Sequence, residues 1–541
     1  MRSRRETLRG LAMPTLAGLL SLVFFVPGLT WGLPTGDVNR YLFGDRTPWT
    51  GEELVALAGG LDADAAADVD RSDDAGVFLN DTDAERAEII IRYRLYSQQP
   101  DEMLTLRAIA SMAERRSPDP QFYTYGGLWM YPVGGLIGVA SVLGFVERGG
   151  LAFYLDQPSE FAKLYIVMRL YAVLWGVVAS VAAAVLVRRI TRSNVLGLVG
   201  GLVVAALPVV VVAAHEAKPH LPGAALALVA VCVADGYVRR GRCRQLLLAG
   251  FFCGAAAGMV PTMLVALVLL PTAWLIRRSR GLTARGSDLA IASSLAAGVF
   301  VATNPFLLLN LPDLASNAGN TASHYQLSVH PSTVGSAWNL FGVATGRLAG
   351  FAGAATLLGG ALLVKGPTGR SLRLLAVPAA VVLVGFAVTS YGRPMDHARF
   401  AILPAMLCAI AAVVSLRLVV RTLSQDAHSF STTLAAALLV LATAAFGAKE
   451  LEGFRRNAAG KDDRVRVVMT LNQLDGGVLR LPADPAPYAV PPFDLWTWQA
   501  TLDSEPDADV DLRRRVDRRL SWADPRLSVL ERKRSNEKPS D

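Results

Sequence analysis

Apolar runs of about 20 residues recur along this chain and alternate with short polar segments rich in arginine. A helix rises about 1.5 Å per residue and the hydrocarbon core of a bilayer is about 30 Å thick, so runs of this length suffice to cross it. The runs occupy residues 11–30, 164–187, 195–213, 221–238, 246–276, 288–310, 342–364, 372–389, 401–420 and 432–448. We therefore predict an all-α polytopic membrane protein with about 11 transmembrane helices, within a range of roughly 10 to 13.

The run at 246–276 counts as two helices in this prediction. Arginine clusters stand at both of its ends, and one straight helix would leave one of them on the wrong side of the membrane. We expect two short helices with a break near Gly258 and Pro261, because proline interrupts helical hydrogen bonding.

Basic residues also give the orientation, because cytoplasmic loops are enriched in lysine and arginine. Several arginines precede the first run, which predicts a cytoplasmic N-terminus. A signal peptide shares this basic start, but no clear small-residue cleavage site follows, so we interpret the run as an uncleaved span. Later clusters alternate consistently with polar loops, at residues 188–192, 239–244, 277–280 and 365–370. Lys449, Arg455 and Arg456 flank the last span on its predicted outer side and so count against this orientation. We keep the orientation because more arginine-bearing loops support it.

Composition supports this class of protein and excludes others. Of 541 residues, 52% are hydrophobic and only 18% are charged, with a mean hydropathy of +0.37, which excludes an ordinary soluble protein. The net charge of +8 comes from the short arginine clusters, so nucleic-acid binding is not indicated. The four cysteines lie in apolar runs or in an arginine-rich loop and predict neither a disulfide framework nor a zinc site.

The longest polar segment, residues 31–126, is expected on the outer side of the membrane. Its acidic block from Asp62 to Glu85 is typical of a solvated insert, and this interpretation is favoured over a metal site because the acids follow no fixed ligand order. Residues 83–115 have apolar positions at helical spacing, which predicts one or two amphipathic helices on the membrane surface. The aromatic stretch at 119–132 leads into 127–147, a run that we expect not to cross the membrane.

This pattern gives two domains. Residues 1–450 form the multi-span domain, and residues 451–541 form a soluble extension with one β-like run, proline-rich turns and a disordered end.

The candidate site begins with four ionisable residues between two apolar runs: His215, Glu216, Lys218 and His220. Such groups at the end of a membrane span are costly unless they reach water or line a cavity. Further polar residues fall on the same predicted side, namely Asp37, Asp45, Asp119, Tyr123, His324, Tyr325, His330, Arg393, His397 and Arg399. We predict that they surround one outer cavity; the alternative is that span ends are polar because they meet lipid headgroups.

The charges of this cavity indicate a chemistry. Arginine and lysine at membrane level suit a phosphate group, and a nearby carboxylate suits a general base that removes a hydroxyl proton. This combination favours transfer of a group from a lipid phosphate carrier.

The order of these parts resembles the C-type glycosyltransferase superfamily, in the branch of protein O-mannosyltransferases and bacterial aminoarabinose transferases. Shared features are an acidic residue soon after the first span, surface helices, the aromatic segment at 119–132, and the sequence Phe-Ala-Lys-Leu-Tyr-Ile-Val-Met-Arg-Leu at 161–170. The segment Arg399-Phe-Ala-Ile-Leu-Pro before a late span is also similar. The likeness covers roughly residues 11–450 in layout.

The resemblance implies inverting transfer of a sugar from a polyprenyl-phosphate donor to a hydroxyl acceptor on a lipid, glycan or protein, at the outer face of a bacterial inner membrane. It implies Asp37 as the general base, with Asp45 as a rival because the family often has Asp-Glu where this chain has Asp37-Val38. It implies that Lys218 or Arg399 holds the donor phosphate, and we add Arg393 and His220 to that group. No cofactor is implied, and whether a divalent metal bridges the phosphate stays open.

Two other functions fit the same layout. A transporter or lipid flippase also places charges in a membrane cavity, but we find no internal repeat, and the charges lie at span ends. A catalytically silent relative with the same fold is the second alternative.

Overall fold

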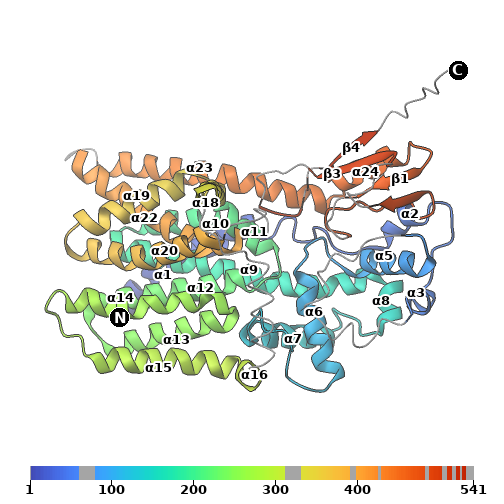
Figure 1. The fold of residues 1–541 in the computed structure, drawn as a ribbon. Helices are drawn as coiled ribbons and strands as arrows, with labels where there is room; N and C mark the ends of the chain where they lie inside the picture. Colours follow the sequence, from blue (N-terminus) through green and yellow to red (C-terminus); the bar gives the residue numbers. More distant parts are fainter. Residues whose placement is uncertain are drawn as a thin grey trace.

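The structure is a computed structural model that describes residues 2–59, 80–310, 331–389, 398–423, 428–481, 486–501, 508–514, 520–523, 525 and 527–531. A long bundle of helices occupies one end of the molecule, and a smaller region of short helices and a β-sheet occupies the other (Figure 1). We call the second part the extramembrane region; it comprises the described residues of 31–126 and 459–531.

Every apolar run that was predicted to cross the membrane contains a helix. The bundle helices are α1 (Arg2–Phe25), α9 (Pro158–Thr191), α10 (Asn194–Ala205), α11 (Pro208–His215), α12 (His220–Arg240), α13 (Cys243–Met259), α14 (Leu269–Arg278), α15 (Gly286–Thr303), α18 (Pro331–Ala344), α19 (Leu348–Leu363), α20 (Gly366–Thr389), α22 (Ile402–Leu423) and α23 (His428–Ala458). Within the described chain, 7 helical stretches are long and apolar enough to span a bilayer, or up to 9 when two bent pairs are counted. The protein is therefore an integral membrane protein with a mostly helical fold.

Lipid-facing surfaces are visible on several of these helices. Leu358, Leu362 and Leu441 are 71%, 75% and 65% exposed, on α19 and α23. Side chains of this kind are stable at a protein surface when acyl chains rather than water surround them.

Proline accounts for two breaks in the bundle. The predicted interruption near Gly258 and Pro261 is confirmed: α13 ends at Met259, and a 3-10 helix, Pro261–Val268, then leads into α14. The pair α10 and α11 is bent by 61°, and α11 begins with Pro208. In both places the missing proline N–H cannot bond to the preceding turn.

The polar segment after α1 folds into short helices. They are a 3-10 helix (Gly36–Val38), α2 (Asn39–Leu42), α3 (Gly51–Leu57), α5 (Asp83–Leu95) and α6 (Glu102–Glu114), followed by α7 (Gly127–Val142) and α8 (Leu151–Asp156). The two helices predicted within 83–115 are thus α5 and α6. The N-terminus of α5 has a capping box, in which Glu85 N donates to Thr82 Oγ1 at 3.2 Å and Thr82 N donates to Glu85 Oε2 at 2.8 Å. The acidic block lies mostly outside the described residues.

The C-terminal segment forms more β-structure than the one β-like run that was predicted there. It forms α24 (Asp463–Leu471) and a four-stranded sheet of β1 (Gly477–Arg480), β2 (Trp498–Thr501), β3 (Val510–Arg514) and β4 (Leu527–Glu531), in the order β2-β1-β3-β4. β1 is parallel to β2 and β3, and β3 is antiparallel to β4. Only one β-like run was predicted, because strands of four or five residues give a very short alternation of apolar and polar positions.

The sheet packs against the first polar segment rather than standing alone. The buried Asn80 donates to Leu495 O at 2.8 Å and Trp498 O at 2.7 Å, and it accepts from Ala500 N at 2.8 Å. The hydroxyl of Tyr93 lies against two further carbonyl oxygens of the C-terminal segment. In Figure 1, α24 and the strands accordingly lie beside α5 and α2, although these segments are far apart in the sequence.

Candidate functional site

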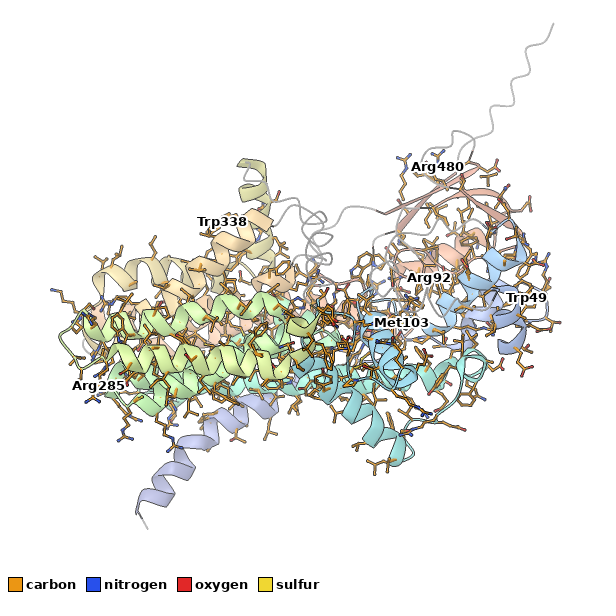
Figure 2. The ribbon with its side chains drawn as sticks, turned by 60° about the horizontal axis from the view of Figure 1, so that its bottom comes forward. Trp49, Arg92, Met103, Arg285, Trp338 and Arg480 are labelled. Atoms are coloured by element: carbon orange, nitrogen blue, oxygen red, sulfur yellow. The ribbon has the colours of Figure 1, made fainter. Side chains whose placement is uncertain are left out.

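The predicted cluster at 215–220 lies at the end of the bundle nearest the extramembrane region. Helix α11 ends at His215 and α12 begins at His220, so the intervening residues form the turn between two bundle helices. All four ionisable side chains of this turn are buried. In Figure 2, Met103 of α6 lies at the junction of the two parts of the molecule, whereas Arg285 lies at the far end of the bundle.

Two cations meet at a carboxylate that sequence reasoning did not single out. Lys218 Nζ lies 2.8 Å from Asp101 Oδ2, and Arg399 donates from Nη1 to the same oxygen at 2.7 Å. Lys218 also lies 3.3 Å from Glu216 Oε2. Arg399 belongs to a 3-10 helix, Ala398–Ala401, immediately before α22. We name Asp101, Glu216, Lys218, His220 and Arg399 the Lys218 cluster.

The charges of the cluster keep both Asp101 and Lys218 ionised. Burial would raise the pKa of Asp101, but the charges of Lys218 and Arg399 outweigh it and hold this pKa well below its usual range. Burial would lower the pKa of Lys218, but Asp101 and Glu216 raise it overall. Burial raises the pKa of Glu216, with Lys218 opposing that shift. Asp101 and Lys218 are therefore an ion pair at neutral pH.

Several buried polar atoms beside this pair have no hydrogen-bond partner in the described chain. They are Glu216 Oε1, His220 Nδ1 and Gln99 Nε2. The other amide atom of Gln99, Oε1, accepts from Asp101 N at 2.6 Å. The ring of His220 lies edge-on to Tyr125 and Phe400, with centroids 6.0 and 6.1 Å away. Buried polar atoms without partners are uncommon in native proteins, so we expect water or a ligand to bind these atoms.

A second, fully buried ion pair lies next to Asp101. Glu102 and Arg169 are both 0% exposed, and the carboxylate accepts two parallel hydrogen bonds from the guanidinium, of 2.9 and 2.7 Å. The same carboxylate accepts from Ala217 N at 2.8 Å and from Ser97 Oγ at 2.6 Å. Glu102 therefore links the start of α6 to the backbone beside Lys218.

Arg169 extends this network to the end of the first span. Its Nη1 donates to Leu29 O at 2.8 Å and to Trp31 O at 2.6 Å, and its guanidinium lies 4.8 Å from the centre of the Trp31 ring. Every polar atom of a buried charge needs a partner of this kind. Arg169 thus fixes α9, the exit of α1 and the start of α6 relative to one another.

The contacts of His215 hold neighbouring helices together. Its Nδ1 lies 2.8 Å from Val211 O and its Nε2 lies 3.0 Å from Pro27 O, so both ring nitrogens face backbone carbonyls. The ring stacks on Phe454 with 4.3 Å between centroids, and the indole of Trp31 donates to the His215 carbonyl at 2.9 Å. These contacts join α11 to α1 and α23.

Asp119 and Tyr123 form a separate hydrogen-bonded group with Asn310. Tyr123 donates its hydroxyl proton to Asp119 Oδ1 at 3.0 Å, and Asn310 Nδ2 donates to Asp119 Oδ2 at 2.7 Å. The structure thus joins the aromatic segment at 119–132 to the end of α16 (Pro305–Leu309).

The two predicted bases lie elsewhere in the extramembrane region. Asp37 is in the 3-10 helix Gly36–Val38, Asp45 follows α2, and both side chains are exposed. Within the described residues no hydrogen bond or ion pair joins either side chain to the Lys218 cluster. The other candidates, His324, Tyr325, His330, Arg393 and His397, lie outside the described residues. The part of the chain that is described contains no group of three or more His, Cys, Asp or Glu side chains arranged to hold a metal ion.

The sequence did contain signals for the residues that were missed. Arg169 is the only charged residue of the run 164–187 before its terminal arginines, and a lone buried charge in a span requires a partner. Asp101 and Glu102 are adjacent acids within the stretch 83–115, for which helices were predicted. These acids are visible in the sequence as possible counter-charges, but the sequence does not show which cation each of them contacts.

Comparison with known proteins gives similarity at the level of solved structures. The sequence matches no protein-family model and no curated protein. The chain is similar to the crystal structure of ArnT from Cupriavidus metallidurans bound to undecaprenyl phosphate, with a TM-score of 0.42 and 15% sequence identity over 84% of this chain and 86% of that chain. It is also similar to the same protein in the apo state, with a TM-score of 0.39 and 15% identity over 84% of this chain and 85% of that chain.

Proposed function

We propose that this protein is a membrane glycosyltransferase that moves a sugar from a polyprenyl-phosphate donor to a hydroxyl acceptor, with inversion at the anomeric carbon. The observation that carries the proposal is the convergence of Lys218 and Arg399 on one carboxylate oxygen, at distances of 2.8 and 2.7 Å. A phosphate oxygen is an acceptor of the same charge and similar size. In this proposal the partnerless Nε2 of Gln99 and Nδ1 of His220 supply further contacts to the phosphate.

Lys218, Arg399 and His220 hold the donor phosphate in this proposal, and Arg393 is assigned the same role. His220 is also the first residue of α12, a helix of 21 residues. The N-terminus of a long helix carries partial positive charge, which favours an anion at this position. These groups stabilise the negative charge that the phosphate gains as the sugar leaves.

Asp37 is proposed as the general base, with Asp45 as the rival. The acceptor hydroxyl oxygen attacks the anomeric carbon, its proton passes to the carboxylate, and the bond from the anomeric carbon to the phosphate oxygen breaks. The phosphate keeps that oxygen and the electron pair. Because both carboxylates are exposed and make no ion pair in the described chain, they are available to accept a proton.

The acceptor is a hydroxyl of a lipid, glycan or protein of the cell envelope, reached from the outer face of a bacterial inner membrane, with the N-terminus in the cytoplasm. This orientation follows from the arginine-rich loops. The donor is drawn from the polyprenyl-phosphate sugars of mannosyltransferase-like and aminoarabinose transferase-like enzymes.

The test measures release of polyprenyl phosphate by the purified protein from labelled polyprenyl-phosphate sugars. Lys218→Met and Arg399→Gln each lower the rate at least about 100-fold, the scale on which an enzyme loses an electrostatic contact to developing charge. The matched control is Arg240→Gln, an exposed cation at the opposite end of α12, which keeps the wild-type rate.

Other outcomes identify other functions. Movement of the lipid across vesicle membranes without release of polyprenyl phosphate would identify a flippase. Full activity in the Lys218→Met/Arg399→Gln double variant would overturn the phosphate assignment. No release from any donor, with folded protein, would identify a silent relative.

A further inference from the structure

We propose that Asp101 and the phosphate of the polyprenyl carrier are alternative partners of Lys218 and Arg399, and that competition from Asp101 promotes release of the product phosphate. This inference rests on the proposed function. It adds a residue that neither the sequence motifs nor the resemblance indicated.

The hydrogen-bond geometry makes the two anions mutually exclusive. A single oxygen, Asp101 Oδ2, accepts from both cations at 2.8 and 2.7 Å. A phosphate oxygen that accepts from the same two donors has to occupy the same position. Binding of the phosphate therefore requires the Asp101 carboxylate to move aside.

The surroundings of Asp101 allow this movement. Asp101 precedes α6, but its side chain makes no capping hydrogen bond to that helix. Its side chain is 19% exposed, unlike the fully buried Glu102 that follows it. Rotation of the Asp101 side chain thus breaks the contacts to the two cations without breaking the Glu102–Arg169 pair.

Both the phosphate and Lys218 still have partners after the phosphate has replaced the Asp101 carboxylate. Glu216 Oε2 stays 3.3 Å from Lys218, so the lysine keeps a counter-ion. The partnerless Gln99 Nε2 is a donor whose own amide oxygen is bonded to the Asp101 backbone. His220 contributes a ring nitrogen without a partner among the described residues. Asp101 satisfies neither Gln99 Nε2 nor His220 Nδ1, so both atoms remain to bind the phosphate in this proposal.

The charges before and after transfer explain why a competing carboxylate is useful. The donor is a phosphodiester with one negative charge. Breaking its bond to the sugar leaves a phosphomonoester, which carries about −1.5 to −2 at neutral pH. The product is therefore held by Lys218 and Arg399 more strongly than the substrate. A carboxylate that returns to the same cations offsets this difference.

Direct binding of undecaprenyl phosphate to the purified full-length protein tests the inference. We expect Asp101→Asn to bind this lipid about tenfold more tightly than the wild type, a change equal to ~1.4 kcal/mol. In turnover assays the same variant should show a lower KM for the donor together with a lower kcat, because product release becomes slower. A variant that merely loosened the fold would raise KM instead.

Controls separate this effect from misfolding and from failure of the proposed function. Asp235→Asn removes another buried carboxylate, which pairs with Arg239 at 2.7 Å near the far end of α12, and it should leave lipid binding unchanged. Asp101→Ser repeats the test with a smaller side chain, should Asp101→Asn not fold. Equal or weaker binding in the folded Asp101 variants, with the wild type binding normally, would overturn the inference. If the wild type does not bind the lipid and Lys218→Met does not change the measured binding, the proposed function is overturned and this inference with it.

Discussion

The buried pair of Glu102 and Arg169 gives the sharpest prediction for stability. Glu102→Gln removes the negative charge but keeps the size of the side chain, so Arg169 becomes an uncompensated cation with 0% exposure. Removing one partner of a buried ion pair costs about 3–5 kcal/mol. The amide also places N–H groups opposite the guanidinium or opposite Ala217 N, where the carboxylate accepted hydrogen bonds. We therefore expect a loss at the upper end of that range.

The assay is equilibrium unfolding of the purified protein in mixed micelles, followed by circular dichroism. The double variant Glu102→Gln/Arg169→Met should lose less stability than the sum of the two single variants, because it leaves neither charge buried alone. Asp83→Asn is the control, since it breaks the exposed pair of Asp83 and Arg86 and should cost at most about 1 kcal/mol. A cost below about 1 kcal/mol for Glu102→Gln, or strict additivity of the two single variants, would refute this account of the network.

Four further predictions test other parts of the structure. Asp37→Asn should lower sugar transfer at least about 100-fold in a folded protein, as loss of a general base does; full activity there with loss in Asp45→Asn would move the base to Asp45. Because the pKa of Glu216 is raised above its ordinary 4.5 by burial, the native state binds a proton more tightly than the unfolded chain, and stability should fall as the pH rises from 4.5 through the raised value. Glu216→Gln should lack this loss in unfolding curves measured across pH, and an unchanged pH dependence would contradict the assignment. Tyr325→Cys, in a Cys243→Ser background, should react with an impermeant thiol reagent added from outside intact cells; protection there would reverse the predicted topology. Asn80→Ala removes three hydrogen bonds between the first polar segment and the sheet, and should cost about 2–4 kcal/mol in unfolding experiments at ~1 kcal/mol each plus the unpaired groups left behind; a cost near zero would show that the two segments do not depend on this contact.

The sequence predicted the bundle well because lipid imposes a simple rule on it. Runs long enough to span a bilayer must be helical, so each predicted run contains a helix, and Pro261 marks a real break. The amphipathic spacing of 83–115 likewise predicted α5 and α6. These features depend on residues that are near one another in the chain.

The pairing of charges within the site could not be predicted in the same way. Lys218 and Arg399 were identified because each stands at the end of a predicted span, where an ionisable group has to reach water or line a cavity. Their partner Asp101 lies among many acids of a polar segment. Arg399 and Asp101 are 298 positions apart, and no local pattern selects one acid over another at that distance. Only one β-like run of the sheet was predicted, for a related reason: β1 is parallel to β2 and β3, so no short hairpin turn marks these pairings in the sequence.

The contact between the first polar segment and the C-terminal segment has a consequence for biosynthesis. Arg92 of α5 donates to the carbonyl of Ala486, 394 residues later in the chain. At a synthesis rate of about 5–20 residues per second, α5 waits roughly 20–80 s for this partner after it leaves the ribosome. During that interval the apolar face of α5 has no sheet to cover it, and the Lys218 cluster sits beside an unfinished fold. In the proposed function, sugar transfer would therefore begin only when translation is almost complete.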